Sequence, residues 1–187
     1  LFLFSQQIFF DFNGYTLMAI GIAKTFGINL PENFNAPYLS QSISEFWKRW
    51  HITLSNWIKN YIYIPLGGSK NGKLKHYINI FIAMLISGIW HGAGYNFILW
   101  GFFHALFIFL EKIFATNYSF IVYRYWKILY TYLLVTFLWL FFRVNNIDDI
   151  SIFFNDFSLI DLVGINTLYF LFIIFLLNYF QKYITVN

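Results

Sequence analysis

An uncharged stretch from Tyr77 to Leu110 constrains the fold of this chain more than any other feature. Its 34 residues include no Asp, Glu, Lys or Arg, but they include His91, which Gly92 and Gly94 follow closely. One straight helix of this length would measure about 50 Å, too long for a hydrocarbon core about 30 Å thick, whereas two full spans and a turn need more residues. Non-helical backbone inside a membrane must be covered by protein or line a wet cavity. We therefore predict two short helices that meet inside the membrane at the glycines.

The composition also indicates an integral membrane protein. The 187 residues are 59% hydrophobic, 25% aromatic and only 11% charged, whereas about a quarter of the residues in a soluble domain are charged. The absence of cysteine excludes disulfides, thiolate metal sites and a cysteine acyl-enzyme. No two histidines have the spacing of a helical metal site. We expect no bound metal or cofactor and no nucleic-acid partner.

Three further segments are apolar enough to cross a membrane. The first runs from Leu1 to about Leu30 and carries a polar group at Asp11–Gly14, which we expect to face away from lipid. Ile128 to Phe142 would cross next, and Thr167 to Phe180 would return. The predicted fold class is therefore all-α, a multi-pass transmembrane helical protein. Because the chain begins in an apolar run without Met, we interpret residues 1–187 as part of a single membrane domain whose N-terminal spans are missing.

An amphipathic helix is predicted between the first apolar segment, which ends near Leu30, and the uncharged stretch that begins at Tyr77. Ser42 and Glu45 form a capping-box pattern, so the helix should begin near Ile43, and Pro65 to Gly68 should end it. Lysine and arginine lie opposite a tryptophan-rich face, which is typical of a helix at the membrane interface. At 100° per residue that face comprises Ile43, Phe46, Trp47, Trp50, Leu54, Trp57, Ile58 and Tyr61, and His51 lies at its edge.

The charged residues predict how the helices are oriented. Basic residues flank the uncharged stretch on both sides, at Lys70, Lys73 and Lys75 before it and at Lys112, Arg124 and Lys127 after it. The positive-inside rule places both segments in the cytoplasm, so the two helices should form a hairpin. Half of the eight acidic residues, Asp148, Asp149, Asp156 and Asp161, follow Arg143, and we place that segment outside.

The four histidines differ in what their surroundings predict. His76 lies in the basic loop and is most simply a solvated surface residue, whereas His104 suits a hydrogen bond between helices. His51 alone would be an ordinary residue of the interface helix. His91 combines a position deep in the membrane with a break in the helix, and ionisable groups at that depth are usually functional.

Five motifs, in this order along the chain, resemble those of the membrane-bound O-acyltransferase (MBOAT) superfamily, and most closely its bacterial alginate O-acetyltransferase branch. They are Phe10–Tyr15, Pro31–Phe34, Ser44–His51, Tyr63–Gly68 and Gly88–Gly92, and the resemblance covers about Gln6 to Val144. The chain departs from the family at Lys59–Asn60, where Arg-Asp is common, so we assign no role to a carboxylate there.

The resemblance implies an O-acyltransferase of the bacterial cell membrane. It implies that His91 of the Trp-His-Gly motif is the catalytic histidine and that His51 is its partner in the active site. We expect Trp90, Trp50 and Asn96 to contact substrate. The donor would be a cytoplasmic thioester, acetyl-CoA or an acyl carrier, and the acceptor a hydroxyl of a cell-envelope polysaccharide.

Two other functions stay open at this point. The first is D-alanyl transfer from a carrier-protein thioester to teichoic acid, which uses a similar Trp-His-Gly site. The second is a transporter or channel in which the broken helix lines a permeation path. A periplasmic acyltransferase partner would favour polysaccharide acetylation, and a carrier-protein ligase would favour D-alanylation.

Overall fold

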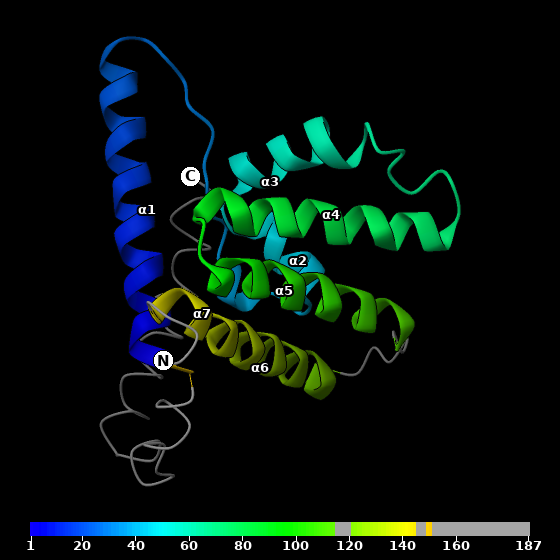
Figure 1. Ribbon diagram of the computed structural model, residues 1–187. Helices are drawn as coiled ribbons and strands as arrows, with labels where there is room; N and C mark the ends of the chain where they lie inside the picture. Colours follow the sequence, from blue (N-terminus) through cyan, green and yellow to red (C-terminus); the bar gives the residue numbers. More distant parts are fainter. Residues whose placement is uncertain (115–120, 145–148, 151–187) are drawn as a thin grey trace, which may run out of the picture.

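The computed structural model describes residues 1–114, 121–144 and 149–150, and within them all regular structure is helical. This confirms the predicted all-α class. Helix α1 (Phe2–Thr25) stands at one side of the molecule, beside the end at which α4 and α5 are joined (Figure 1). Much of its surface is exposed and apolar, including Leu17, Met18 and Ile22. Such a surface is compatible with contact with lipid.

The predicted hairpin is present, but its two helices are not short. Helix α4 (Lys73–His91) and helix α5 (Tyr95–Ile113) have 19 residues each and lie side by side (Figure 1). The break falls at Gly92–Gly94, as predicted. Each helix extends beyond the uncharged stretch into charged residues at the open end of the hairpin, and so measures about 28 Å. The prediction of short helices was wrong because the helices do not stop where the charges begin.

Two glycines allow the backbones of α4 and α5 to come into contact. A Cβ atom at Gly88 would lie 2.3 Å from the carbonyl oxygen of Phe97, and one at Gly101 would lie 2.4 Å from that of Met84. Small residues commonly permit such close approach between helices in membranes. The two glycines therefore set the spacing between α5 and α4, the helix that ends at His91.

The predicted interface helix is instead two helices with a sharp turn between them. Helix α2 (Ile43–Arg49) begins as predicted, because the Ser42 hydroxyl accepts a hydrogen bond from the Glu45 N–H. Helix α3 (Ile52–Ile58) follows, and a π-helical turn, η2 (Lys59–Tyr63), continues it. His51 separates α2 from α3 in a left-handed conformation, with φ 43° and ψ 55°.

The side chains of the predicted apolar face differ in how far they are buried. Trp57 and Tyr61 are 51% and 68% exposed. Ile43, Phe46 and Trp50 are buried together with aromatic residues of the other helices. The prediction of one continuous helix was therefore wrong at residue 51, whereas Leu54 and Ile58 of the predicted apolar face are buried beyond the turn.

The described chain ends with helix α6 (Ile121–Leu138) and the short helix α7 (Leu140–Arg143). Within the described residues, Tyr95–Ile113 and Tyr123–Arg143 are long and apolar enough to cross a membrane. The second contains the predicted span Ile128–Phe142 and begins earlier. The predicted span Thr167–Phe180 and the acidic residues 148, 156 and 161 lie outside the described residues. A one-turn 3-10 helix, η1 (Pro37–Leu39), precedes α2.

Candidate active site

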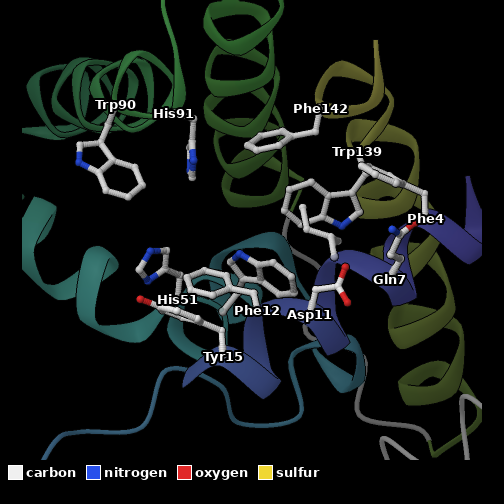
Figure 2. A pocket seen from close by; sticks show the side chains of 12 residues that line it. Phe4, Gln7, Asp11, Phe12, Tyr15, His51, Trp90, His91, Trp139 and Phe142 are labelled. Carbon is white, nitrogen blue, oxygen red and sulfur yellow. The ribbon is translucent and has the colours of Figure 1, made fainter. Parts of the chain in front are cut away.

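A cavity of about 520 Å³ opens where α1, the α2–α3 turn, the end of α4 and the α6–α7 junction meet (Figure 2). The residues that line it are mostly aromatic, and the ionisable ones are Asp11, Tyr15, His51 and His91. The full lining is Phe4, Gln7, Ile8, Asp11, Phe12, Tyr15, Trp50, His51, Trp90, His91, Trp139 and Phe142. It resembles a ligand pocket in having an apolar wall with a few polar groups.

His91 reaches the cavity because α4 ends there. It is the last residue of the helix, and Gly92 follows with an extended backbone. Its half-buried ring packs edge-on against Trp100 and Phe142, with ring centroids 5.2 and 4.9 Å away. Within the part of the chain that the structure describes, the imidazole contacts other aromatic rings and makes no hydrogen bond. Both ring nitrogens are thus available to a bound molecule.

His51 lies on the opposite wall of the same cavity (Figure 2). Its ring packs edge-on against Phe12 at 4.7 Å and lies 6.0 Å from the ring of Trp90. Nδ1 of His51 is 3.4 Å from Oδ1 of Asn33. Burial lowers the pKa of His51 to about 4, because a low dielectric disfavours the charged imidazole. The ring is therefore neutral at physiological pH.

The three residues expected to contact substrate have different positions. Trp90 is 60% exposed and lines the cavity beside both histidines. Trp50 also lines it, but is mostly buried among the rings of Phe34, Phe46 and Trp139. Both positions are compatible with contact to a bound molecule.

Asn96 is not among the residues that line the cavity. It is 5% exposed, and its amide donates to the carbonyl oxygens of Phe141 and Val144, at 2.9 and 3.3 Å. These bonds satisfy carbonyls at the end of α7, which a helix end would otherwise leave unpaired. The amide of Asn96 thus holds α7 against the start of α5, outside the cavity, and its contact with substrate stays a prediction.

Sequence reasoning recognised a polar group around Asp11 but did not place it in the site. Gln7, Asp11 and Tyr15 recur at four-residue intervals on α1, and all three line the cavity. This spacing puts them on one face of the helix. The signal was present in the sequence, but the apolar residues around it obscured a polar stripe on a membrane helix.

The remaining two histidines lie elsewhere. His104 is fully buried, and its Nδ1 accepts a hydrogen bond from Nε1 of Trp47 at 3.3 Å, which confirms the predicted hydrogen bond between helices. The prediction that His76 is a solvated surface residue was wrong. It is half-buried, with Nδ1 2.6 Å from the Tyr63 hydroxyl and Nε2 2.8 Å from Nζ of Lys112.

A second cavity, of about 290 Å³, lies along α4 and has several lysines in its lining. Lys48, Lys59 and Lys112 line it, together with apolar residues that include Ile80 and Met84. Of the described residues that line this cavity, none is acidic. The lysines are thus not neutralised from within it, and the cavity suits a molecule with a negatively charged group and an apolar part.

Comparison with known proteins covers most of this chain. Residues 1–148 match the model of the MBOAT, membrane-bound O-acyltransferase family. The probable alginate O-acetylase AlgI of Pseudomonas syringae pv. tomato is 47% identical over 147 residues, which are 77% of this chain and 28% of that protein. The peptidoglycan O-acetyltransferase of Helicobacter pylori is 43% identical over 148 residues, 78% of this chain and 28% of that protein.

A third relative has a different printed activity. The teichoic acid D-alanyltransferase of Bacillus subtilis is 37% identical over 110 residues, 55% of this chain and 28% of that protein. The chain thus spans less than a third of the length of the relatives it matches. The family match itself includes both cavity histidines and the helices that carry them. The chain therefore belongs to the membrane-bound O-acyltransferase family.

Proposed function

We propose that the full-length protein is an O-acyltransferase of the bacterial inner membrane that transfers acetyl from a cytoplasmic thioester towards an extracytoplasmic polysaccharide. The observation that carries this proposal is the pair of histidines, His51 and His91, on opposite walls of one cavity. Acyl transfer to an alcohol needs a base for the hydroxyl proton, and neutral imidazole suits that role. The relatives that act on alginate and peptidoglycan support acetyl as the acyl group.

His91 is the general base in this proposal. It accepts the proton of the acceptor hydroxyl as the oxygen attacks the carbonyl carbon of the thioester. The new C–O bond forms, the C–S bond breaks, and the proton passes from the imidazolium to the departing thiolate. The ring is free of recorded hydrogen bonds within the described residues, so a nitrogen is available for both transfers. The aromatic lining limits the entry of water, which would otherwise hydrolyse the donor.

The second cavity supports a donor that approaches from the cytoplasm. Both thioesters considered, acetyl-CoA and an acyl carrier with a phosphopantetheine arm, bear phosphate. Lys48, Lys59 and Lys112 would attract phosphate, and the apolar floor would accept the rest of the arm. His76, Ile80, Met84 and Ser87 of this cavity recur on one face of α4, and the same face leads to His91. The donor would follow that face toward the base.

Ester analysis of the cell envelope tests the proposed function. The full-length protein, with its neighbouring genes, should add alkali-labile acetate to the envelope polysaccharide of a host that lacks this modification. His51→Ala should impair the transfer while the protein stays in the membrane, because its tryptophans still anchor it.

The same assay separates the alternatives. Ester-linked D-alanine in place of acetate would assign the protein to D-alanyl transfer, which the Bacillus subtilis relative favours. No new ester of either kind, with the protein present in the membrane, would contradict acyl transfer and favour a transporter or channel. Full transfer by His51→Ala would show that His51 is not needed for the reaction.

The orientation in the membrane is tested with accessibility tags in the full-length protein. Tags at Asn71 and Asn117 should both report the cytoplasm, because the open end of the α4–α5 hairpin and the basic residues lie together (Figure 1). A tag at Asp149 should report the outside. Tags at Asn71 and Asn117 on opposite sides would show that the segment between them crosses the membrane once, and the hairpin topology would fail.

A further inference from the structure

A loop before α2 holds the turn that presents His51. The N–H of Ile52 donates to the carbonyl oxygen of Asn33 at 3.0 Å, and the N–H of Asn35 donates to the carbonyl oxygen of Arg49 at 3.0 Å. The loop thus bonds to the backbone on both sides of His51. These bonds support a left-handed conformation that a residue with a side chain rarely adopts.

The side chain of Asn33 has a defined orientation at this turn. One of its terminal atoms lies 3.2 Å from the backbone nitrogen of Thr53 and 2.6 Å from the Thr53 hydroxyl oxygen. A backbone N–H can only donate, so this atom is the oxygen, Oδ1. The amide nitrogen Nδ2 then faces the hydroxyl of Thr16 at 3.5 Å. Oδ1 satisfies an N–H of the first turn of α3, for which His51 provides no side-chain cap.

The same oxygen lies 3.4 Å from Nδ1 of His51. Because Oδ1 can only accept, the contact favours a proton on Nδ1. In a neutral imidazole the other nitrogen, Nε2, then has the lone pair. We propose that Asn33 is a positioning residue that fixes His51 as the Nδ1–H tautomer, so that Nε2 accepts a hydrogen bond from a molecule in the cavity.

This inference rests on the proposed function and makes the role of His51 more specific. A neutral His51 with an unprotonated Nε2 can hold the acceptor by accepting a hydrogen bond from a second hydroxyl of the sugar, because the single proton of the reacting hydroxyl goes to His91. It cannot donate from Nε2 to the oxyanion that forms on the thioester carbonyl. His51 thus orients the alcohol while His91, whose ring has only ring contacts recorded among the described residues, exchanges the proton.

Histidine ¹⁵N NMR of the full-length protein in membranes tests the tautomer directly, with a His51→Gln variant to assign the signal. We expect a protonated Nδ1 and an unprotonated Nε2 on His51 in the wild type, and loss of this preference in Asn33→Ala. A protonated Nε2 in the wild type, or an unchanged signal in Asn33→Ala, would overturn the proposal. This measurement needs no acyl transfer, so it separates the failure of this inference from the failure of the proposed function.

The rate of acyl transfer against pH tests the consequence for the reaction. Asn33→Ala should lower the rate by on the order of 10–100-fold, the range known for removing the hydrogen-bond partner that orients a metal-binding histidine. Asn33→Asp keeps an acceptor oxygen for Thr53 and for Nδ1, but its carboxylate stabilises the charged imidazole and raises the pKa of His51. The acidic limb of the pH–rate profile should therefore lie at higher pH in Asn33→Asp than in the wild type, where burial lowers the pKa of His51.

A matched variant separates the contact of Asn33 with His51 from its bond to the Thr53 hydroxyl. Thr53→Val removes the 2.6 Å bond to Oδ1 and leaves the oxygen beside His51, so the rate and the pH profile should stay close to those of the wild type. The ionisable groups that share the cavity are His91, Asp11 and Tyr15, and none of these variants changes them. Unchanged profiles in both Asn33 variants would overturn the positioning role.

Discussion

Acyl transfer is expected to fall by about 10²–10⁴-fold when His91 of the full-length protein is replaced by alanine, the range typical of a lost general base. The ring is half-buried at the cavity wall and packs against Trp100 and Phe142. Its loss leaves space at the surface of the cavity and does not open a closed core. The abundance of the protein in the membrane should therefore stay close to that of the wild type, as measured by quantitative immunoblotting beside the ester assay.

Two comparisons make the His91 result decisive. His91→Gln keeps a polar side chain of similar size but has no basic nitrogen, so it should be as inactive as His91→Ala. Tyr95→Phe changes a 76% exposed residue just beyond the same turn, which does not line the cavity, and should transfer normally. Near-normal transfer by either His91 variant would rule out His91 as the base.

Gly101→Val is expected to separate α4 from α5 and to lower the stability of the protein severely. The first added carbon would lie 2.4 Å from the carbonyl oxygen of Met84 and 3.3 Å from Cα of Leu85. Both atoms belong to the backbone of α4 and cannot move aside as a side chain can. Overpacking typically costs about 1–3 kcal/mol, and a clash between two backbones should reach at least the upper part of that range. Thermal unfolding in detergent and abundance in the membrane would measure the loss.

Gly21 provides the control for that experiment. It also lies in a helix, but a Cβ there would meet nothing within 4 Å. Gly21→Val makes the same chemical change on an open surface, so it should leave the unfolding temperature nearly unchanged. Equal losses of stability in both variants would mean that the valine itself, and not the contact between α4 and α5, causes the effect.

The elements that could be predicted from sequence are those whose signals are local. The break at Gly92–Gly94 and the cap at Ser42 depend on residues next to them in the chain, and both are in the structure. The turn at His51 depends instead on bonds from Asn33 and Asn35, well before it in the sequence. A helical wheel contains no information about such bonds, so it predicted one continuous helix.

The site shows the same division between local and distant signals. His91 stands out because a polar residue and a helix break coincide, whereas the choice of His51 depended on the resemblance to a family. Asn96 follows the Trp-His-Gly motif closely, and its burial under carbonyls of α7 could not be read from that position. The environment of His76 was missed for a similar reason, since Lys112, which contacts it, belongs to the other helix of the hairpin and lies 36 residues later in the sequence.

The left-handed backbone at His51 has a consequence for how this turn can evolve. For a residue with a side chain, that conformation costs about 1–2 kcal/mol, and glycine would adopt it nearly freely. A glycine at position 51 would thus make the turn easier to fold and would remove the imidazole from the cavity. Under the proposed function, stability and chemistry therefore favour different residues at this one position. A histidine at this position therefore has the cost of a strained turn, which the proposed role of His51 in the cavity would explain.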